Sequence, residues 1–145
     1  MSGYNVSRIM GVDYGLKRIG IAMTDMLHIT SSPFGTIEGI SMKENMLKIL
    51  EIAKTNDVSV IVFGLPVNMN GSEGWMARTV RKVIEEIKLV SSIEVATIDE
   101  RLTTVQAERI LIDEGDVSRK KLKGLKDKIA AALILQVYVD THPSV

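Results

Sequence analysis

Apolar and polar positions change their spacing several times along the chain, and these changes define the predicted elements. Two short runs rich in apolar and β-branched residues, Arg8–Asp13 and Arg18–Thr24, are separated by a turn that contains Gly15. This pattern is typical of two antiparallel strands. A third, weaker strand is expected over residues 33–37. Three strands with short connections predict an antiparallel meander.

Helical spacing replaces the strand pattern in the next segment. Apolar residues recur three and four positions apart between Met42 and Ala53, and Ser41 is a suitable N-cap with Glu44 as its capping-box partner. The nearly continuous apolar run over residues 58–63 then predicts a strand that is buried on both faces.

The second half of the chain alternates helices with one further strand. We expect a helix over residues 75–89, a strand over 93–98, a helix that begins at Thr103 or Thr104, and a final helix that ends near Tyr138. Strands joined through helices run parallel. The sequence therefore predicts an α/β fold with a five-stranded mixed sheet, three strands antiparallel and two parallel, flanked by helices.

Composition restricts the possible chemistry. The length of 145 residues fits one domain, 1–145, in which residues 1–7 are expected to be a frayed N-terminus. Because the chain has no Cys and 2 His, thiolate zinc sites, cysteine nucleophiles and histidine-rich metal sites are excluded. A bound metal would be a hard cation held by carboxylates, Mg²⁺ or Mn²⁺. Without a membrane span or a signal-peptide pattern, we expect a cytoplasmic protein.

Basic residues are unevenly distributed in a chain whose formal net charge is +0. They concentrate in residues 119–128, a stretch that includes Lys120, Lys121 and Lys123. Such a stretch is either a phosphate-binding face or the solvated start of a helix. As a phosphate-binding face, these lysines would follow a nucleic-acid backbone and make binding dependent on salt.

Carboxylates end two of the predicted strands. Asp13 closes the first strand, and Asp99 and Glu100 follow the last one. If the first strand is central, these strand ends lie at one edge of the sheet, where open sheets bind their ligands. Since adjacent residues of a strand point to opposite faces, the pattern does not decide between Asp99 and Glu100.

A third acid, Asp127, begins an otherwise apolar stripe of the final helix that should face the sheet. The alternative is an acid on the first helical turn, stabilised by the helix dipole and by neighbouring lysines. Three converging acids repel one another, and divalent cations relieve this repulsion well. Two such ions can activate a water and stabilise the leaving oxygen in phosphodiester cleavage.

Four motifs in this order resemble the YqgF family, the Holliday-junction-resolvase-like branch of the RNase H-like nucleases. They are RIMGVDYG at 8–15 with RIG at 18–20, GLP at 64–66 with NGS at 70–72, DERLTT at 99–104, and Asp127 before the alanines at 130–131. The resemblance implies an RNase H-like nuclease that depends on Mg²⁺ or Mn²⁺. It also implies that Asp13, Glu100 and Asp127 are the catalytic, metal-binding acids, and it favours Glu100 over Asp99.

The same resemblance suggests two substrates. One is precursor ribosomal RNA, with 5′-end processing of pre-16S rRNA during ribosome biogenesis as the reaction and the small ribosomal subunit as a partner. The other is branched DNA, cut as a Holliday junction resolvase would cut it. Junction resolution calls for a symmetric homodimer, because two strands are cut in register, whereas a monomer suffices to trim RNA.

Other polar and aromatic residues allow two interpretations each. Arg18 and Arg101 would hold phosphates or, as the structural alternative, form salt bridges with Asp13 or Glu100 or lie in a solvated turn. Asn70 lies in a Gly-rich loop that would turn toward a nucleotide or remain a plain surface loop. Trp75 would stack on a base or, as is commoner for one Trp at a helix start, lie in the core.

Two other functional classes fit parts of the pattern. The Gly-x-Asp-x-Gly sequence around Asp13 also resembles the phosphate loop of actin-like ATPases and sugar kinases. Those proteins enclose the nucleotide between two such domains, and this chain is long enough for one. A non-catalytic nucleic-acid-binding module of the same fold is the third class, and it predicts binding that survives loss of the acids.

Overall fold

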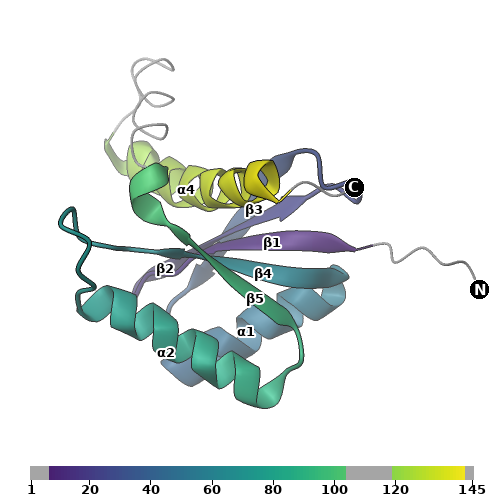
Figure 1. Ribbon diagram of the computed structural model, residues 1–145, viewed down its shortest axis with the longest axis horizontal. Helices are drawn as coiled ribbons and strands as arrows, with labels where there is room; N and C mark the ends of the chain where they lie inside the picture. The colour runs from purple at the N-terminus through teal and green to yellow at the C-terminus, as the bar shows by residue number, and fades with distance from the viewer. Residues whose placement is uncertain (1–6, 104–118, 143–145) are drawn as a thin grey trace, which may run out of the picture.

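The computed structural model describes residues 7–103 and 119–142, with side chains described for 7–103 and 129–142. Five strands form one sheet in the order β3-β2-β1-β4-β5 (Figure 1). The strands are β1 Arg8–Asp13, β2 Arg18–Thr24, β3 Ser31–Glu38, β4 Val58–Leu65 and β5 Glu94–Asp99. β1, β2 and β3 pair antiparallel, whereas β4 pairs parallel with β1 and β5 with β4. The predicted mixed sheet is thereby confirmed.

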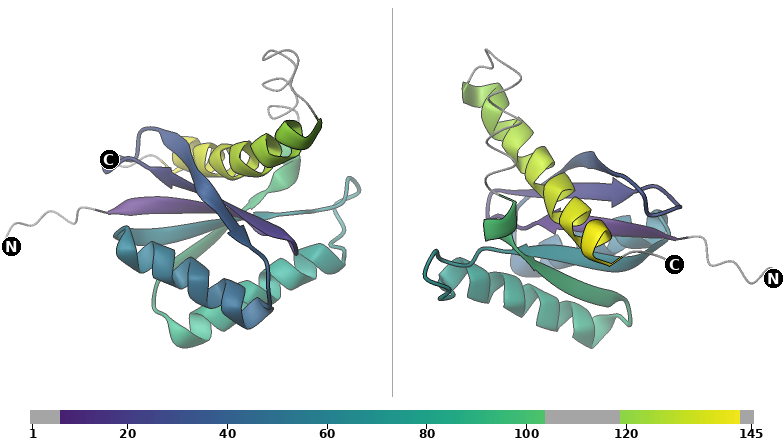
Figure 2. Two further views of the ribbon diagram at one scale, coloured as in Figure 1. Left: turned by 180° about the vertical axis from the view of Figure 1, so that it is seen from behind. Right: turned by 45° about the horizontal axis from the view of Figure 1, so that its top comes forward.

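Helices cover both faces of this sheet. They are α1 Met42–Thr55, α2 Trp75–Val90, the single 3₁₀ turn η1 Glu100–Leu102, and α4 Arg119–Thr141. α1 and α2 lie on one face and α4 crosses the other (Figure 2). The predicted helix after Thr104 falls outside the described residues. No helix in the described ranges is long and apolar enough to span a membrane.

The central strand β1 separates two apolar cores because its side chains alternate between the faces. Met10 and Val12 pack in the core shared with α1 and α2, while Ile9 packs with residues of α4 such as Leu135. Asp13 shares the parity of Ile9. Its side chain therefore belongs to the α4 face, at the end of the strand.

The first helix follows the predicted pattern. Ser41 is the N-cap, and its side chain accepts a hydrogen bond from the backbone N–H of Glu44. Met46, Ile49 and Ala53 are buried at helical spacing. These contacts confirm that the change of period after the meander marks a helix.

The last helix begins earlier than the apolar spacing indicates. α4 starts at Arg119, so the basic stretch is helical and Asp127 lies in the third turn. The interpretation of Asp127 as a first-turn acid stabilised by the helix dipole is therefore wrong, because that effect is confined to the first turn. Lys, Arg and Leu have high helix propensity, which explains why the helix extends through a segment without an apolar stripe.

Gly11 lets α4 lie directly on β1. A Cβ atom at this position would be 2.7 Å from the carbonyl oxygen of Ala131 and 2.8 Å from Cβ of Leu135. One of these contacts is backbone, so the helix would have to move as a whole. The position of α4 over the sheet thus depends on this glycine.

We expect Gly11→Ala to lower the free energy of unfolding by about 2 kcal/mol, since overpacking a rigid helix–sheet contact costs about 1–3 kcal/mol. Gly35→Ala in β3 is the matched control, because a Cβ atom there meets nothing within 4 Å. Urea denaturation of both variants measures the effect. Equal midpoints for the two variants would show that the close approach of α4 is not needed for stability.

Candidate active site

The carboxyl groups of Asp13 and Glu100 meet on the α4 face of the sheet, across β4. β4 lies between β1 and β5, with Leu65 in register with Asp99. A Cβ atom on Gly64 would lie 2.8 Å from Oε1 and 2.9 Å from Cγ of Glu100. The Glu100 side chain therefore passes over Gly64, and it reaches a hydrogen bond with Asp13.

Gly64 is a site residue that the sequence interpretation did not include. Its missing side chain leaves the space through which Glu100 approaches Asp13. A glycine inside an apolar strand often marks a close approach of another group. The glycine that follows the apolar run of residues 58–63 was the available signal.

Burial, together with the hydrogen bond to Asp13 and the charges of Asp13 and Asp99, raises the pKa of Glu100 to about 8. Glu100 therefore holds a proton at neutral pH and donates it to the Asp13 carboxylate. Two carboxyl groups in contact cannot both be charged at low cost. A divalent cation would remove this conflict by replacing the shared proton.

Asp99 is held apart from this acid pair by Arg101. Nη2 of Arg101 lies 2.6 Å from Oδ2 of Asp99, and the pair lowers the pKa of Asp99. Arg101 thus forms its salt bridge with Asp99 and not with Asp13 or Glu100, the partners considered from the sequence. Because the 3₁₀ turn η1 starts at Glu100, these neighbours separate: Glu100 joins Asp13, and Asp99 joins Arg101.

The loop between β4 and α2 is a compact polar turn. The side-chain oxygen of Asn70 accepts hydrogen bonds from the backbone N–H (3.0 Å) and the hydroxyl (2.6 Å) of Ser72, and Gly71 has a φ of 87°. Glu73 anchors the loop to α2 through two hydrogen bonds from Arg81, at 2.6 and 2.7 Å. The Asn70 side chain therefore shapes its own loop, and a contact with nucleic acid remains a prediction.

The other predicted site residues lie in β2 and α4. Arg18 begins β2, two residues before Gly20, which pairs with Asp13. Lys120, Lys121, Lys123 and Asp127 lie in α4, but their side chains are outside the described residues. Among the side chains that are described, no three acids or histidines are grouped closely enough to hold a metal ion.

Trp75, at the first residue of α2, has 59% of its surface exposed. The interpretation of this side chain as a core residue is wrong. Helix amphipathicity explains the difference, since the buried residues of α2 begin at Ala77 and continue at Val80 and Val83. Trp75 lies outside that stripe.

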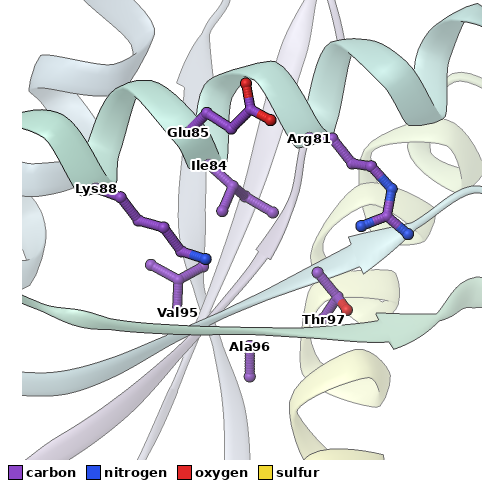
Figure 3. Close-up of a pocket in the computed structure, with 7 residues that line it drawn as sticks. All are labelled: Arg81, Ile84, Glu85, Lys88, Val95, Ala96 and Thr97. Carbon is purple, nitrogen blue, oxygen red and sulfur yellow. The ribbon is translucent and has the colours of Figure 1, made fainter.

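A separate groove lies on the opposite face of the sheet, between α2 and the edge strand β5 (Figure 3). Its volume is about 310 Å³, and its lining includes Arg81, Glu85, Lys88 and Thr97. Neither Asp13 nor Glu100 lines this groove, so it is a site distinct from the acid pair.

The donor atoms of the acid pair suit a hard divalent cation. Both side chains supply carboxylate oxygens, the ligands that Mg²⁺ and Mn²⁺ prefer. Burial and the contact with Asp13 raise the pKa of Glu100, and a cation held between the two carboxyl groups would lower it again. The residues present therefore fit such an ion.

Solved structures with the same fold include two junction-resolving enzymes. One is Thermus thermophilus RuvC in complex with a Holliday junction substrate, with a TM-score of 0.56 and 11% identity over 94% of this chain and 96% of that one. The other is the fowlpox virus resolvase with Holliday junction DNA, with a TM-score of 0.56 and 14% identity over 94% and 99% of the chains. At such low identity these similarities establish the fold alone, which is that of the RuvC-like, RNase H-fold nucleases.

Sequence relatives are much closer. A protein of Endomicrobium trichonymphae named "Putative pre-16S rRNA nuclease" is 70% identical over 135 residues, 93% of this chain and 96% of its own. A protein of Thermoanaerobacter pseudethanolicus with the same name is 43% identical over 93% and 97% of the two chains. The family model of RuvX, described as Holliday junction resolvase, matches residues 7–141. The chain belongs to the RuvX family, which confirms the resemblance found in the motifs.

Proposed function

We propose that residues 1–145 form one divalent-metal-dependent nuclease domain that hydrolyses phosphodiester bonds, with pre-16S rRNA as its substrate. The observation that carries this proposal is the contact between Asp13 and Glu100, with the pKa of Glu100 raised to about 8. A half-buried pair of acids in contact at the carboxyl edge of a sheet is costly to fold, and a hydrolytic metal site would give it a function. Family membership and the names of the relatives support the same assignment.

Asp13, Glu100 and Asp127 would hold the metal, and Mg²⁺ or Mn²⁺ when bound would supply an activated water and stabilisation of the leaving oxygen. The protein contributes the arrangement. β1 fixes Asp13, η1 turns Glu100 toward it, and Gly64 leaves the space between them. Without a metal, the proton on Glu100 keeps the two carboxyl groups in contact.

The backbone of α4 supports the assignment of Asp127. The helix runs opposite to β1 (Figure 1), and Ala131 lies against Gly11. Asp127 is one turn before Ala131, about 6 Å along the helix, and Asp13 is two residues beyond Gly11, a similar distance along the strand. Both displacements lead toward the carboxyl edge of the sheet. This course of the helix backbone supports Asp127 as the third acid of the proposed site.

Two different substrates are suggested for this nuclease. The names of the two relatives described above point to precursor 16S rRNA, which would place the protein in the cytoplasm and in contact with the small ribosomal subunit. The description of the family points to a four-way DNA junction. A resolvase must present two sites related by symmetry, whereas trimming an RNA end needs one.

One experiment tests the proposal and separates the two substrates. The purified protein is incubated with end-labelled RNA that spans the 5′ end of 16S rRNA and its precursor sequence, and with a labelled four-way junction. Each substrate is tested with Mn²⁺, with Mg²⁺ and with excess EDTA. We expect metal-dependent cleavage of the RNA. Symmetric cutting of the junction alone would favour the resolvase, and no cleavage of either substrate would reject the nuclease assignment.

A further inference from the structure

Three large apolar side chains are exposed in η1 and in the loop and first helical turn that follow β4. Met69 is 88% exposed in the β4–α2 loop, Trp75 is 59% exposed at the start of α2, and Leu102 is 59% exposed in η1. We call these three residues the apolar rim. Figures 1 and 2 show the β4–α2 loop and η1 at the same end of the sheet. Leu102 is two residues from Glu100, so this member of the rim lies in the same turn as one of the proposed catalytic acids.

Hydrogen bonds hold the apolar rim next to the acids. Arg101, the residue after Glu100, donates from Nη1 to the carbonyl oxygen of Met69 at 3.3 Å. At the other end of the loop, Glu73 forms an ion pair with Arg81 of α2. Glu73 lies two residues before Trp75 in the chain. The loop is therefore tied both to η1 and to α2. Trp75 follows directly on this fixed loop.

Exposed cations follow Trp75 along α2. Arg78 and Lys82 lie three and seven residues after Trp75, which places all three on one side of the helix. Arg78 also donates from Nη1 to the carbonyl oxygen of Glu73 at 3.1 Å, so it lies against the loop. An aromatic side chain next to basic residues is the arrangement by which proteins bind single-stranded nucleic acid: bases stack and phosphates are neutralised.

We propose that Trp75 stacks on an unpaired base of the strand that the acid pair cuts, so that the site selects single-stranded over duplex nucleic acid. This inference rests on the proposed nuclease function. A base within a duplex has both faces covered by its neighbours, and only an unpaired base offers a free face to an aromatic ring. Met69 and Leu102 would flank that base, while Arg78 would contact a phosphate.

The surface favours a nucleic-acid strand over a protein partner. The members of the apolar rim are separated by polar groups, among them Asn70, Ser72 and Arg101. A protein-binding patch has a continuous apolar centre with a polar border, which differs from this mixture. The stacking interpretation also gives a role to a large aromatic residue that is exposed at the first residue of α2.

Trp75 is the single Trp of the chain, so its fluorescence reports on this position alone. The Asp13→Asn variant, expected not to cleave, is titrated in Mg²⁺ with a 12-nucleotide single-stranded RNA and with a blunt duplex of the same sequence. We expect saturable quenching by the single strand and little change with the duplex. Absence of quenching at saturating single strand would overturn the proposal.

Affinity is then measured by anisotropy of fluorescein-labelled RNA. Trp75→Ala is expected to weaken single-strand binding about 10-fold, in line with the loss of one stacked base, and Trp75→Phe less than 3-fold. Leu89→Ala is the matched control, since Leu89 is 78% exposed near the other end of α2. Unchanged affinity of Trp75→Ala, or equal weakening for single strand and duplex, would reject stacking.

Cleavage by the wild-type protein is assayed separately, which keeps the two proposals apart. Metal-dependent cleavage with unchanged binding by Trp75→Ala rejects the stacking role and leaves the nuclease intact. Strand-specific quenching without cleavage by the wild type under any metal rejects the nuclease, and with it the role of Trp75 at a cleavage site.

Discussion

Asp13→Asn is expected to reduce metal-dependent cleavage by roughly 10³-fold or more while the protein remains folded. An amide is a much weaker ligand for a hard cation than a carboxylate, and the metal supplies several kcal/mol of transition-state stabilisation. At 1.36 kcal/mol for each factor of ten, a loss of about 4 kcal/mol gives this reduction. Initial rates on the preferred substrate at saturating Mn²⁺ measure the effect.

The fold should tolerate this change because Asp13 faces another acid. The Glu100 carboxyl group carries an elevated pKa partly through the charge of Asp13, so a neutral side chain at position 13 relieves repulsion. Asp140→Asn is the matched control: Asp140 is exposed near the far end of α4, where it accepts a hydrogen bond from Gln136. Comparable cleavage rates for Asp13→Asn and Asp140→Asn would exclude Asp13 from the reaction.

Glu100→Gln is expected to stabilise the metal-free protein at high pH. The pKa of Glu100 is about 8 in the folded protein, above the value of 4.5 that is usual for a glutamate in an unfolded chain. Below pH 4.5 the group is protonated in both the folded and the unfolded state. Between pH 4.5 and 8 the folded protein keeps a proton that the unfolded chain has lost, so the free energy of unfolding falls as pH rises.

The glutamine variant lacks this pH dependence because it cannot ionise. At pH 8 we expect it to exceed the wild type by about 3 kcal/mol, or about 10 °C in Tm, and the difference should vanish near pH 4. Thermal unfolding in EDTA across this range measures it. Glu94→Gln, at the exposed start of β5, is the control. An equal Tm for Glu100→Gln and wild type at pH 8 would contradict the burial of a protonated Glu100.

Periodicity was sufficient to predict the architecture. The strands β1, β2 and β5 and the helices α1 and α2 lie within one or two residues of their expected bounds, because each has a regular apolar pattern and a clear turn or cap. β3 is longer than expected at both ends. It is an edge strand with mostly exposed side chains, so backbone pairing with β2 defines it more than apolar alternation does.

The candidate site was predictable in outline and not in detail. The expectation that Asp13 and the Asp99-Glu100 pair approach one another follows from strand ends at one edge of a sheet. The choice between the two neighbours depends on the turn η1 and on the salt bridge of Asp99 with Arg101. Both arise from tertiary geometry, which alternation along one strand does not contain.

The most direct test of the acid pair as a metal site is the release of protons when Mn²⁺ binds. Calorimetric titration of the wild type at pH 7 in two buffers with different ionisation enthalpies gives the number of protons released per ion. With the pKa of Glu100 at about 8, we predict that binding of one Mn²⁺ releases close to one proton, and that Glu100→Gln releases none. Release of equal numbers of protons by the two proteins, or no binding of Mn²⁺ to the wild type, would contradict a metal site at Asp13 and Glu100.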